Sequence, residues 1–172
     1  MDEHSYFTED DLCGVVHVVD LDGAFTPDEI IKGADVEKVQ YYCDKIEIRS
    51  ENIDKLKFSR QSKRKILEHL SSIDTIIIPK GKSVPYSIYY MSCNLDHVLH
   101  QKMNSTNREK QDDSFSFSDE YDDPEKFENF FNNDEIKIPG SYKETWDYVK
   151  KDYNSLKRGS NFWICINKYK DN

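Results

Sequence analysis

The sequence predicts one α/β domain spanning residues 1–172, with a mainly parallel sheet flanked by helices. Short apolar, β-branched runs alternate along the chain with segments of helical periodicity, as in strand–helix–strand units. The length suits a single domain, and aromatic residues, at 13% of the chain, can fill its core.

The first predicted strand is Gly14–Val19, a β-branched run without a helical period. Such a run is typical of a parallel strand that is buried on both faces. It ends at Asp20. A helix is then expected to begin with Thr26 as N-cap, Pro27 at the first helical position and Glu29 closing a capping box.

The middle of the chain is expected to hold three strands and one basic helix. The helix, Ser59–Ser72, places Ile66, Leu67 and Leu70 on one side. The strands are Lys45–Arg49, Thr75–Ile78 and Tyr86–Met91, the last two separated by the turn Pro79–Pro85.

The second half is expected to be mainly helical and to end in a strand. One predicted helix begins at Asn94 and runs to Met103. Two helices are expected in the acidic region, one of which begins at Asp123-Pro124 and carries Phe127, Phe130 and Phe131. A further helix begins at the capping box of Ser141 and Glu144 and runs to about Leu156. Phe162–Ile166 is the predicted closing strand. Residues 105–123, especially Ser105–Ser118, are rich in polar turn formers and predict a mobile acidic loop.

Charge is distributed unevenly along the chain. Of the formal net charge of −9, residues 105–136 contribute −8, from 11 acidic and 3 basic residues. Residues 55–65 hold six basic residues and no acid, a pattern that suits either a solvated helix face or a phosphate-bearing partner. If that partner is a nucleic acid, its backbone would be contacted by Lys57, Arg60, Lys63 and Arg64.

The chain carries no pattern of a secreted or membrane protein. No apolar run approaches the roughly 20 residues of a membrane span, and the first residues do not resemble a signal peptide. The four cysteines are widely spaced and predict buried free thiols rather than disulfides or a zinc site. We therefore expect a cytoplasmic protein that makes no membrane contact.

The strongest chemical signal is the acidic loop Asp20–Gly23, which follows the first strand. In open parallel sheets, ligands bind beyond the carboxyl ends of the strands. Asp20 and Asp22 can turn toward one hard cation if Leu21 points into the core and Gly23 allows a sharp turn. Mg²⁺ is the expected cofactor because it prefers oxygen ligands and its coordination shell is usually completed by water and substrate phosphate oxygens. The alternative is an Asx turn that merely ends the strand.

A second candidate cluster lies at the corner after the strand Tyr86–Met91. Ser92 and Asn94 could bind phosphate at a helix start, and His97 could act as a general base. Each residue also has a purely structural interpretation, with Asn94 as an N-cap and Asp96 as a favourable first-turn charge. His97 and His100 alone make a weak metal pair.

Two family resemblances follow from these segments. Val18–Gly23 resembles the aspartate motif of TOPRIM domains, the magnesium-binding folds of topoisomerases, primases and OLD-type nucleases, and Ser92–His97 is similar to the corner of TOPRIM-like phage-defence proteins. This resemblance implies that Asp20 and Asp22 hold magnesium. TOPRIM domains also carry a catalytic glutamate after an earlier strand. Glu3 and Glu9 follow no apolar run and do not match it, so either the domain is shortened or another acid takes that place.

Asp20–Gly23 also resembles the first motif of haloacid-dehalogenase-like phosphatases. That resemblance implies Asp20 as nucleophile and Asp22 as acid/base, although Ala24 departs from the usual threonine. Ser92 would stand for the second motif. Loose candidates for the remaining lysine and acidic pair are Lys102 and Asp112-Asp113.

Three hypotheses result. The first is a Mg²⁺-dependent, nuclease-like enzyme of TOPRIM type that acts on nucleic acid through Asp20, Asp22 and His97. The second is a phosphatase that uses Asp20 on a phosphorylated small molecule. The third is a non-enzymatic binding or inhibitory protein whose acidic segment engages a basic protein partner.

Overall fold

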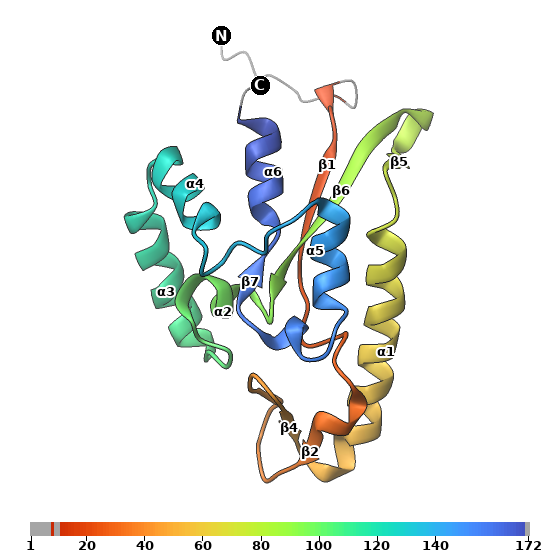
Figure 1. Cartoon of the computed structure of the whole chain (residues 1–172), viewed down its shortest axis with the longest axis vertical. Coiled ribbons are helices and arrows are strands. Elements are labelled where there is room, and N and C mark those ends of the chain that lie inside the picture. The colour runs from red at the N-terminus through yellow and green to blue at the C-terminus, as the bar shows by residue number, and fades with distance from the viewer. Residues whose placement is uncertain (1–7, 9–10, 171–172) are drawn as a thin grey trace.

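The computed structural model describes residue 8 and residues 11–170, which form a mixed α/β arrangement of two small sheets and six α-helices (Figure 1). The larger sheet has the order β1 (Val15–Asp20), β6 (Ser83–Ser92), β5 (Thr75–Ile77), and β7 (Gly159–Ser160) pairs with the end of β6. The smaller sheet has the order β2 (Ile31–Gly33), β4 (Ile46–Ile48), β3 (Gln40–Tyr41).

The sheets are mixed rather than mainly parallel. β1 is parallel to β6 and β2 is parallel to β4, whereas β5, β7 and β3 pair in antiparallel fashion. The reason lies in the connections, because the single turn Pro79–Gly81 between β5 and β6 can only reverse the chain. The long crossover from β1 to β6 contains helix α1 (Ile53–Leu70), which accommodates a parallel pairing.

β6 is the central strand, and its two faces are covered by different helices. Ile88 and Tyr90 face a core shared with α1 and with α5 (Tyr142–Val149), where Tyr90 lies 5.1 Å from Trp146 between ring centroids. Met91 faces a second core built with α2 (Leu95–His100), α4 (Pro124–Asn132) and α6 (Phe162–Tyr169). The alternation of side chains along one strand therefore connects both halves of the molecule.

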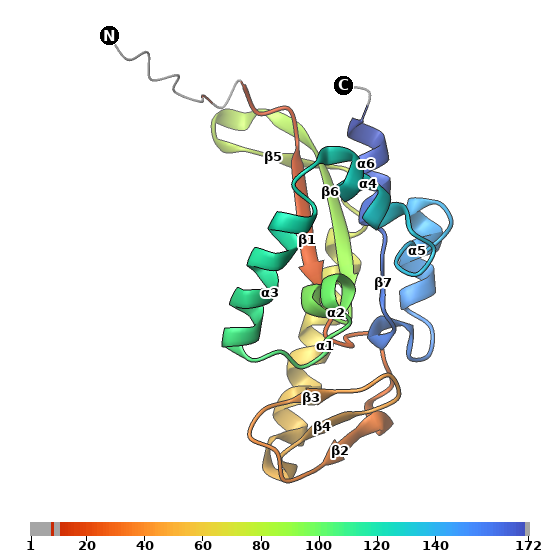
Figure 2. The same ribbon diagram turned by 90° about the vertical axis from the view of Figure 1, so that its left-hand side faces the viewer.

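β1 lies at one end of the larger sheet, and α3 (Asn107–Glu120), which stands apart from β1 in Figure 1, lies nearer the viewer in Figure 2. The expectation that this strand is buried on both faces is wrong, because Val16 and Val18 are each 41% exposed. Val15 and Val19 on the opposite face pack partly against the core. The carboxyl end of β1 is thus reachable from solvent.

The sequence predicts the beginnings of helices best where a side chain caps them. Asn94 caps α2, Asp123 caps α4, and Ser141 and Glu144 form a capping box on α5. The expected loop at 105–118 is wrong: Thr106 and Glu109 form a second such box, and the helix α3 follows. Its capping pattern outweighs its polar composition.

Two elements differ from expectation for identifiable reasons. The helix expected at Thr26 is a single 3₁₀ turn at Asp28–Ile30, because the Thr26 hydroxyl donates to the Gly23 carbonyl and is also contacted by Arg60 instead of capping. The expected strand Phe162–Ile166 is part of α6, since Phe162 and Ile166, one helical turn apart, pack against the core that contains Phe131 of α4. In the basic helix α1, Leu67 is buried but Ile66 is 57% exposed.

In the described part of the chain, no helix is both long and apolar enough to cross a membrane. All four cysteines are free thiols, with Cys93 and Cys165 buried as expected and Cys13 and Cys43 exposed.

Candidate active site

Asp20 and Asp22 lie where the loop after β1 runs alongside the end of β6. Asp20 is opposite Met91 in the parallel register, and the Asp22 amide donates to the Cys93 carbonyl at 2.7 Å. The carboxyl ends of β1 and β6 are therefore brought to one edge of the sheet, the position where open α/β sheets bind ligands.

The loop turns as its sequence predicts. Leu21 is completely buried in the core. Asp22 and Gly23 have φ angles of 48° and 63°, so two consecutive residues adopt the left-handed conformation for which glycine is best suited. Since the aspartates flank a buried leucine, both carboxylates are directed away from the core.

In each aspartate side chain, one carboxylate oxygen is bonded to a neighbouring group. Asp20 Oδ1 accepts a hydrogen bond from the Leu95 amide at 2.8 Å, and Asp22 Oδ2 lies 2.5 Å from Lys63 Nζ. The second oxygen of each carboxylate has no hydrogen-bond partner among the residues that the structure describes.

The two carboxylates also interact electrostatically. Burial raises the pKa of Asp20, and the neighbouring charge of Asp22 raises it further, against the opposing influence of the Leu95 amide, Lys63 and Lys110. Negative charge is therefore concentrated at this point, and a cation bound there would relieve the repulsion.

The basic side chains of α1 divide into two roles. Arg60 is only 3% exposed and donates to the Gly23 carbonyl at 2.6 Å and to the Thr26 carbonyl at 2.9 Å. Arg64 donates to the Ala24 and Thr26 carbonyls. These arginines fasten the loop that carries Asp22, so Arg60 is not free to contact a nucleic-acid backbone.

Lys63 is the basic residue of this stretch that reaches the aspartates, and its side chain is 33% exposed. Lys57 is partly exposed on the same helix and does not line either of two surface hollows that open next to Asp20, one between α2 and α3 and one between β1 and α1.

The corner after β6 is built from internal hydrogen bonds. The Ser92 hydroxyl donates to the Asn154 carbonyl, and the Asn94 side chain accepts from the His97 amide while donating to the Met103 carbonyl. The Leu95 amide is already occupied by Asp20. Ser92 and Asn94 thus have structural roles in place of the expected phosphate contacts.

His97 is a structural residue as well. It is 7% exposed, and its Nδ1 accepts a hydrogen bond from the Cys93 amide at 3.2 Å. Burial, with a smaller contribution from Arg158, lowers the pKa of His97 to about 4. Because its Nδ1 is occupied by the Cys93 amide and the ring is buried, His97 orients the corner. It does not meet the requirement that a general base face the reacting group.

Lys110, which the sequence did not single out, and Asp96, expected only as a favourable first-turn charge, lie beside Asp20. Lys110 of α3 forms an ion pair of 3.1 Å with Asp96, whose side chain is 15% exposed, and both line a hollow that Asp20 also lines. Lys110 is one of only three basic residues in the acidic segment. That rarity is the signal that could have singled it out.

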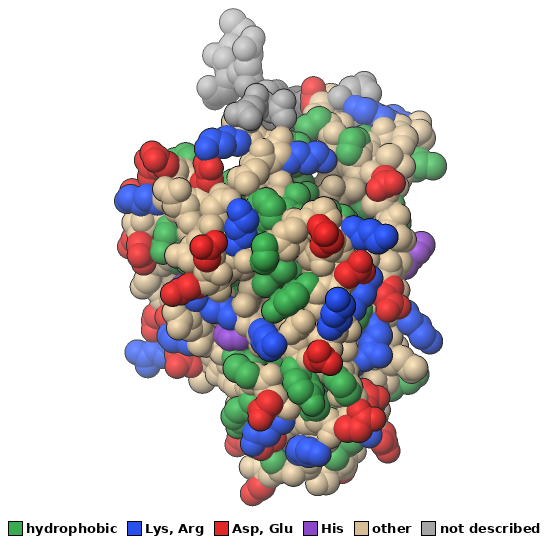
Figure 3. Space-filling model, in the orientation of Figure 1, with side chains coloured by type: hydrophobic (Ala, Val, Ile, Leu, Met, Phe, Trp, Pro, Cys, Tyr) green, Lys and Arg blue, Asp and Glu red, His purple; other side chains and the backbone are tan. Residues whose placement is uncertain are grey.

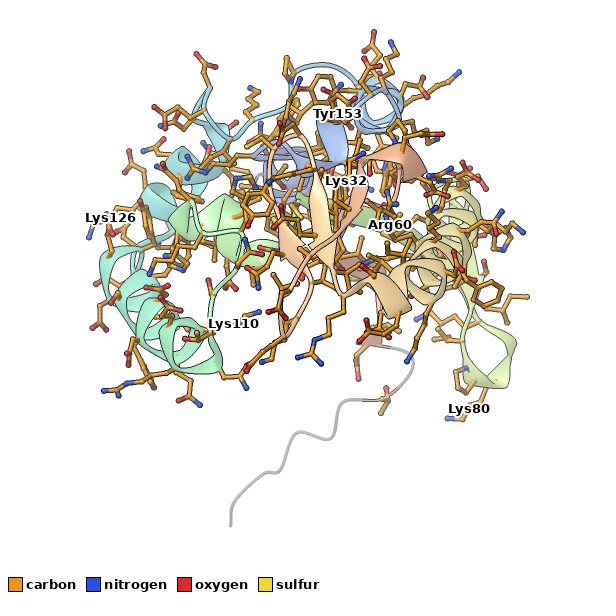
Figure 4. The ribbon with its side chains drawn as sticks, turned by 90° about the horizontal axis from the view of Figure 1, so that it is seen from below. Lys32, Arg60, Lys80, Lys110, Lys126 and Tyr153 are labelled. Carbon is orange, nitrogen blue, oxygen red and sulfur yellow. The ribbon has the colours of Figure 1, made fainter. Side chains whose placement is uncertain are left out.

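Asp20 separates two hollows on the surface. One, of about 330 Å³, lies between α2 and α3, and the other, of about 470 Å³, lies between β1 and α1 and includes His17, Lys63 and Ile66. Seen from below, Arg60 on α1 and Lys110 on α3 lie on opposite sides of the middle of the molecule (Figure 4).

Other candidates from the sequence lie elsewhere. Lys102 and Asp113 form an ion pair of 2.7 Å with each other, so they do not extend the Asp20 site in the way that the phosphatase resemblance implies. Glu3 and Glu9 are outside the described residues. Within the described chain, no group of three or more His, Cys, Asp or Glu side chains could hold a metal ion.

Comparisons with protein-family models, curated proteins and solved structures found no match to this chain. A fold by itself does not define an activity, so the chemistry of the site determines what this chain can do.

Proposed function

We propose that this protein cleaves phosphodiester bonds in a reaction that depends on a divalent cation held by Asp20 and Asp22. The supporting observation is the position of the two carboxylates. They lie together at the carboxyl end of β1, the charge of Asp22 raises the pKa of Asp20, and each carboxylate keeps one oxygen without a hydrogen bond to a described residue.

The donor set fits Mg²⁺ better than a transition metal. It consists of carboxylate oxygens, and the absence of a third acidic, His or Cys ligand among the described residues leaves several coordination positions to water and substrate. Mg²⁺ commonly binds proteins through one or two carboxylates and completes its shell with water and phosphate oxygens. We therefore expect weak binding of the metal alone and tighter binding with a phosphodiester present.

The protein groups around the aspartates would position the substrate. Lys63 neutralises Asp22 in the structure, and a cation on Asp22 would free its ammonium group to contact a phosphate oxygen. Arg60 and Arg64 hold the loop, and the Leu95 amide fixes one oxygen of Asp20. When bound, the metal would supply an activated water molecule, so the site needs no histidine base.

The test is a pair of neutralising variants, Asp20→Asn and Asp22→Asn. Mn²⁺ binding is followed by electron paramagnetic resonance, and cleavage of a fluorescently labelled single-stranded oligonucleotide is followed with Mg²⁺ or Mn²⁺. We expect each variant to lose at least about 100-fold in cleavage. Asp119→Asn, an exposed acid on α3, is the matched control and should behave like the wild type.

Two results would overturn the proposal: a wild-type protein that binds no Mn²⁺ even with a phosphodiester present, or variants that cleave as fast as the wild type. A stable beryllofluoride adduct on Asp20 would instead support the phosphatase alternative, in which Asp20 is the nucleophile.

A binding function has its own supporting observation. In Figure 3, acidic side chains lie over α3 and α4, and Asp119, Glu120 and Asp122 of this region are exposed. If a basic partner protein is recognised here, charge reversal at these three residues will abolish its binding while Asp20→Asn leaves it intact. If the charge-reversal variant still binds the partner and Asp20→Asn does not, this surface is not the binding site.

A further inference from the structure

The hollow between α2 and α3 has features that the proposed cleavage reaction does not yet use. It has a volume of about 330 Å³ and opens directly beside Asp20. Its lining combines charged, hydroxyl and aromatic side chains: Asp20, Asp96, Lys110, Ser114, Phe117 and His100.

One side of the hollow is aromatic and held in place. The Phe117 and His100 rings are 5.9 Å apart between centroids and meet edge to face. Phe117 also packs against Tyr121 at 4.5 Å and against Phe130 at 5.2 Å. A ring fixed from several sides offers a preformed surface for a flat ligand and loses little side-chain entropy when it binds one.

The other side of the hollow is charged. Lys110, whose side chain is 52% exposed, pairs with Asp96 and acts electrostatically on Asp20. Asp20 lines both hollows, with Lys63 of α1 in one and Lys110 of α3 in the other, and Figure 4 shows Lys110 on the side of α3 that faces the middle of the molecule. Two lysines on either side of one carboxylate suit a phosphate chain that continues in both directions.

We propose that the α2–α3 hollow receives one base of a single-stranded nucleic acid whose backbone crosses the end of β1 at Asp20, with Lys110 contacting the adjacent phosphate. This inference rests on the proposed function, because it places the cleaved phosphodiester at Asp20. The second hollow, next to Lys63, gives the strand a path onward between β1 and α1. A base within a duplex is stacked and paired, so it would have to leave the helix before it could enter.

The experiment fills the hollow without touching the aspartates. Ser114→Trp places a large ring in it from an exposed position on α3, and Ser116→Trp makes the same change on the same helix at an exposed position that does not line it. Binding is measured by fluorescence anisotropy, with Ca²⁺ in place of Mg²⁺, for three labelled probes: a four-nucleotide single strand, an abasic deoxyribose-phosphate chain of the same length, and a duplex.

We expect the wild type and Ser116→Trp to bind the base-bearing strand at least about tenfold more tightly than the abasic chain, from the stacking of one base. Ser114→Trp should lose this preference and keep the same affinity for the abasic chain and for Mn²⁺. Lys110→Met should weaken both single-stranded probes equally and reduce the slope of log affinity against log salt by about one.

The metal and base readouts separate the two proposals. Loss of Mn²⁺ binding in Asp20→Asn tests the cleavage site and is independent of the hollow. If the wild type binds Mn²⁺ but does not distinguish the base-bearing from the abasic strand, or if Ser114→Trp retains the preference, the base-binding role is wrong. Preferential binding of the duplex would also overturn it.

Discussion

Replacing Arg60 by Met tests how the loop that carries Asp22 is held. The guanidinium is buried and donates to the Gly23 carbonyl, to the Thr26 carbonyl and hydroxyl, and to Asp28 Oδ1 at 3.0 Å. Methionine fills most of the same volume but donates no hydrogen bond, so the substitution isolates the polar contacts.

The cost follows from these contacts. A hydrogen bond to a charged group contributes about 1.5–3 kcal/mol, but the loop carbonyls keep other donors: Gly23 also accepts from Thr26, and Thr26 also accepts from Arg64. The Asp28 side chain is 48% exposed and can be rehydrated. Taking the lower end for the two carbonyl bonds gives a loss of about 3 kcal/mol in the free energy of unfolding.

Urea denaturation provides the assay. With a slope of about 2 kcal/mol per molar urea, a loss of 3 kcal/mol lowers the unfolding midpoint by about 1.5 M. Mn²⁺ affinity should fall as well, since the loop loses its anchor. Lys57→Met on the same helix is the control and should change stability by less than about 0.5 kcal/mol. A loss below about 1 kcal/mol in Arg60→Met would refute the anchoring role.

Two further predictions concern the corner after β6 and the turn after β1. Because the folded-state pKa of His97 is depressed to about 4, its contribution to stability is complete above pH 6.5 and declines by about 3 kcal/mol as the pH falls toward 4. In His97→Asn, which keeps an acceptor near the Cys93 amide, that part of the pH dependence in urea titrations should disappear; an unchanged profile would assign it to another group. Gly23→Ala should cost at least about 1–2 kcal/mol, because φ is +63° and the new Cβ would lie 2.8 Å from Leu156 Cδ2; a thermal melt like that of the wild type would contradict this.

The local signals in the sequence predicted local structure well. Caps at Asn94, Asp123 and Ser141 were predicted because each satisfies amides within three residues of itself. Thr26 has the same pattern and forms no such cap, because its hydroxyl contacts Arg60, which lies far along the chain. Interactions of that range leave no periodic pattern in the sequence.

The same difference between local and long-range interactions holds for the candidate site. The turn at Asp22 and Gly23 and the inward direction of Leu21 follow from residue type alone. The uses of Ser92, Asn94 and His97 depend on partners brought in by folding, such as Asn154 for Ser92. Lys110 reaches Asp20 only because a segment of loop-like composition forms α3.

The pairing of Val15 with Tyr86 has a consequence for how the molecule assembles. Residues 16–85 must be closed into a loop before this first parallel contact can form. The loss of conformational entropy on closing the loop therefore precedes any stabilising free energy from the contact. The hairpin of β5 and β6 and the helix α1 need no such closure. The edge that carries both aspartates should therefore be completed late in folding, with Asp20 reaching Leu95 only once the strands have met.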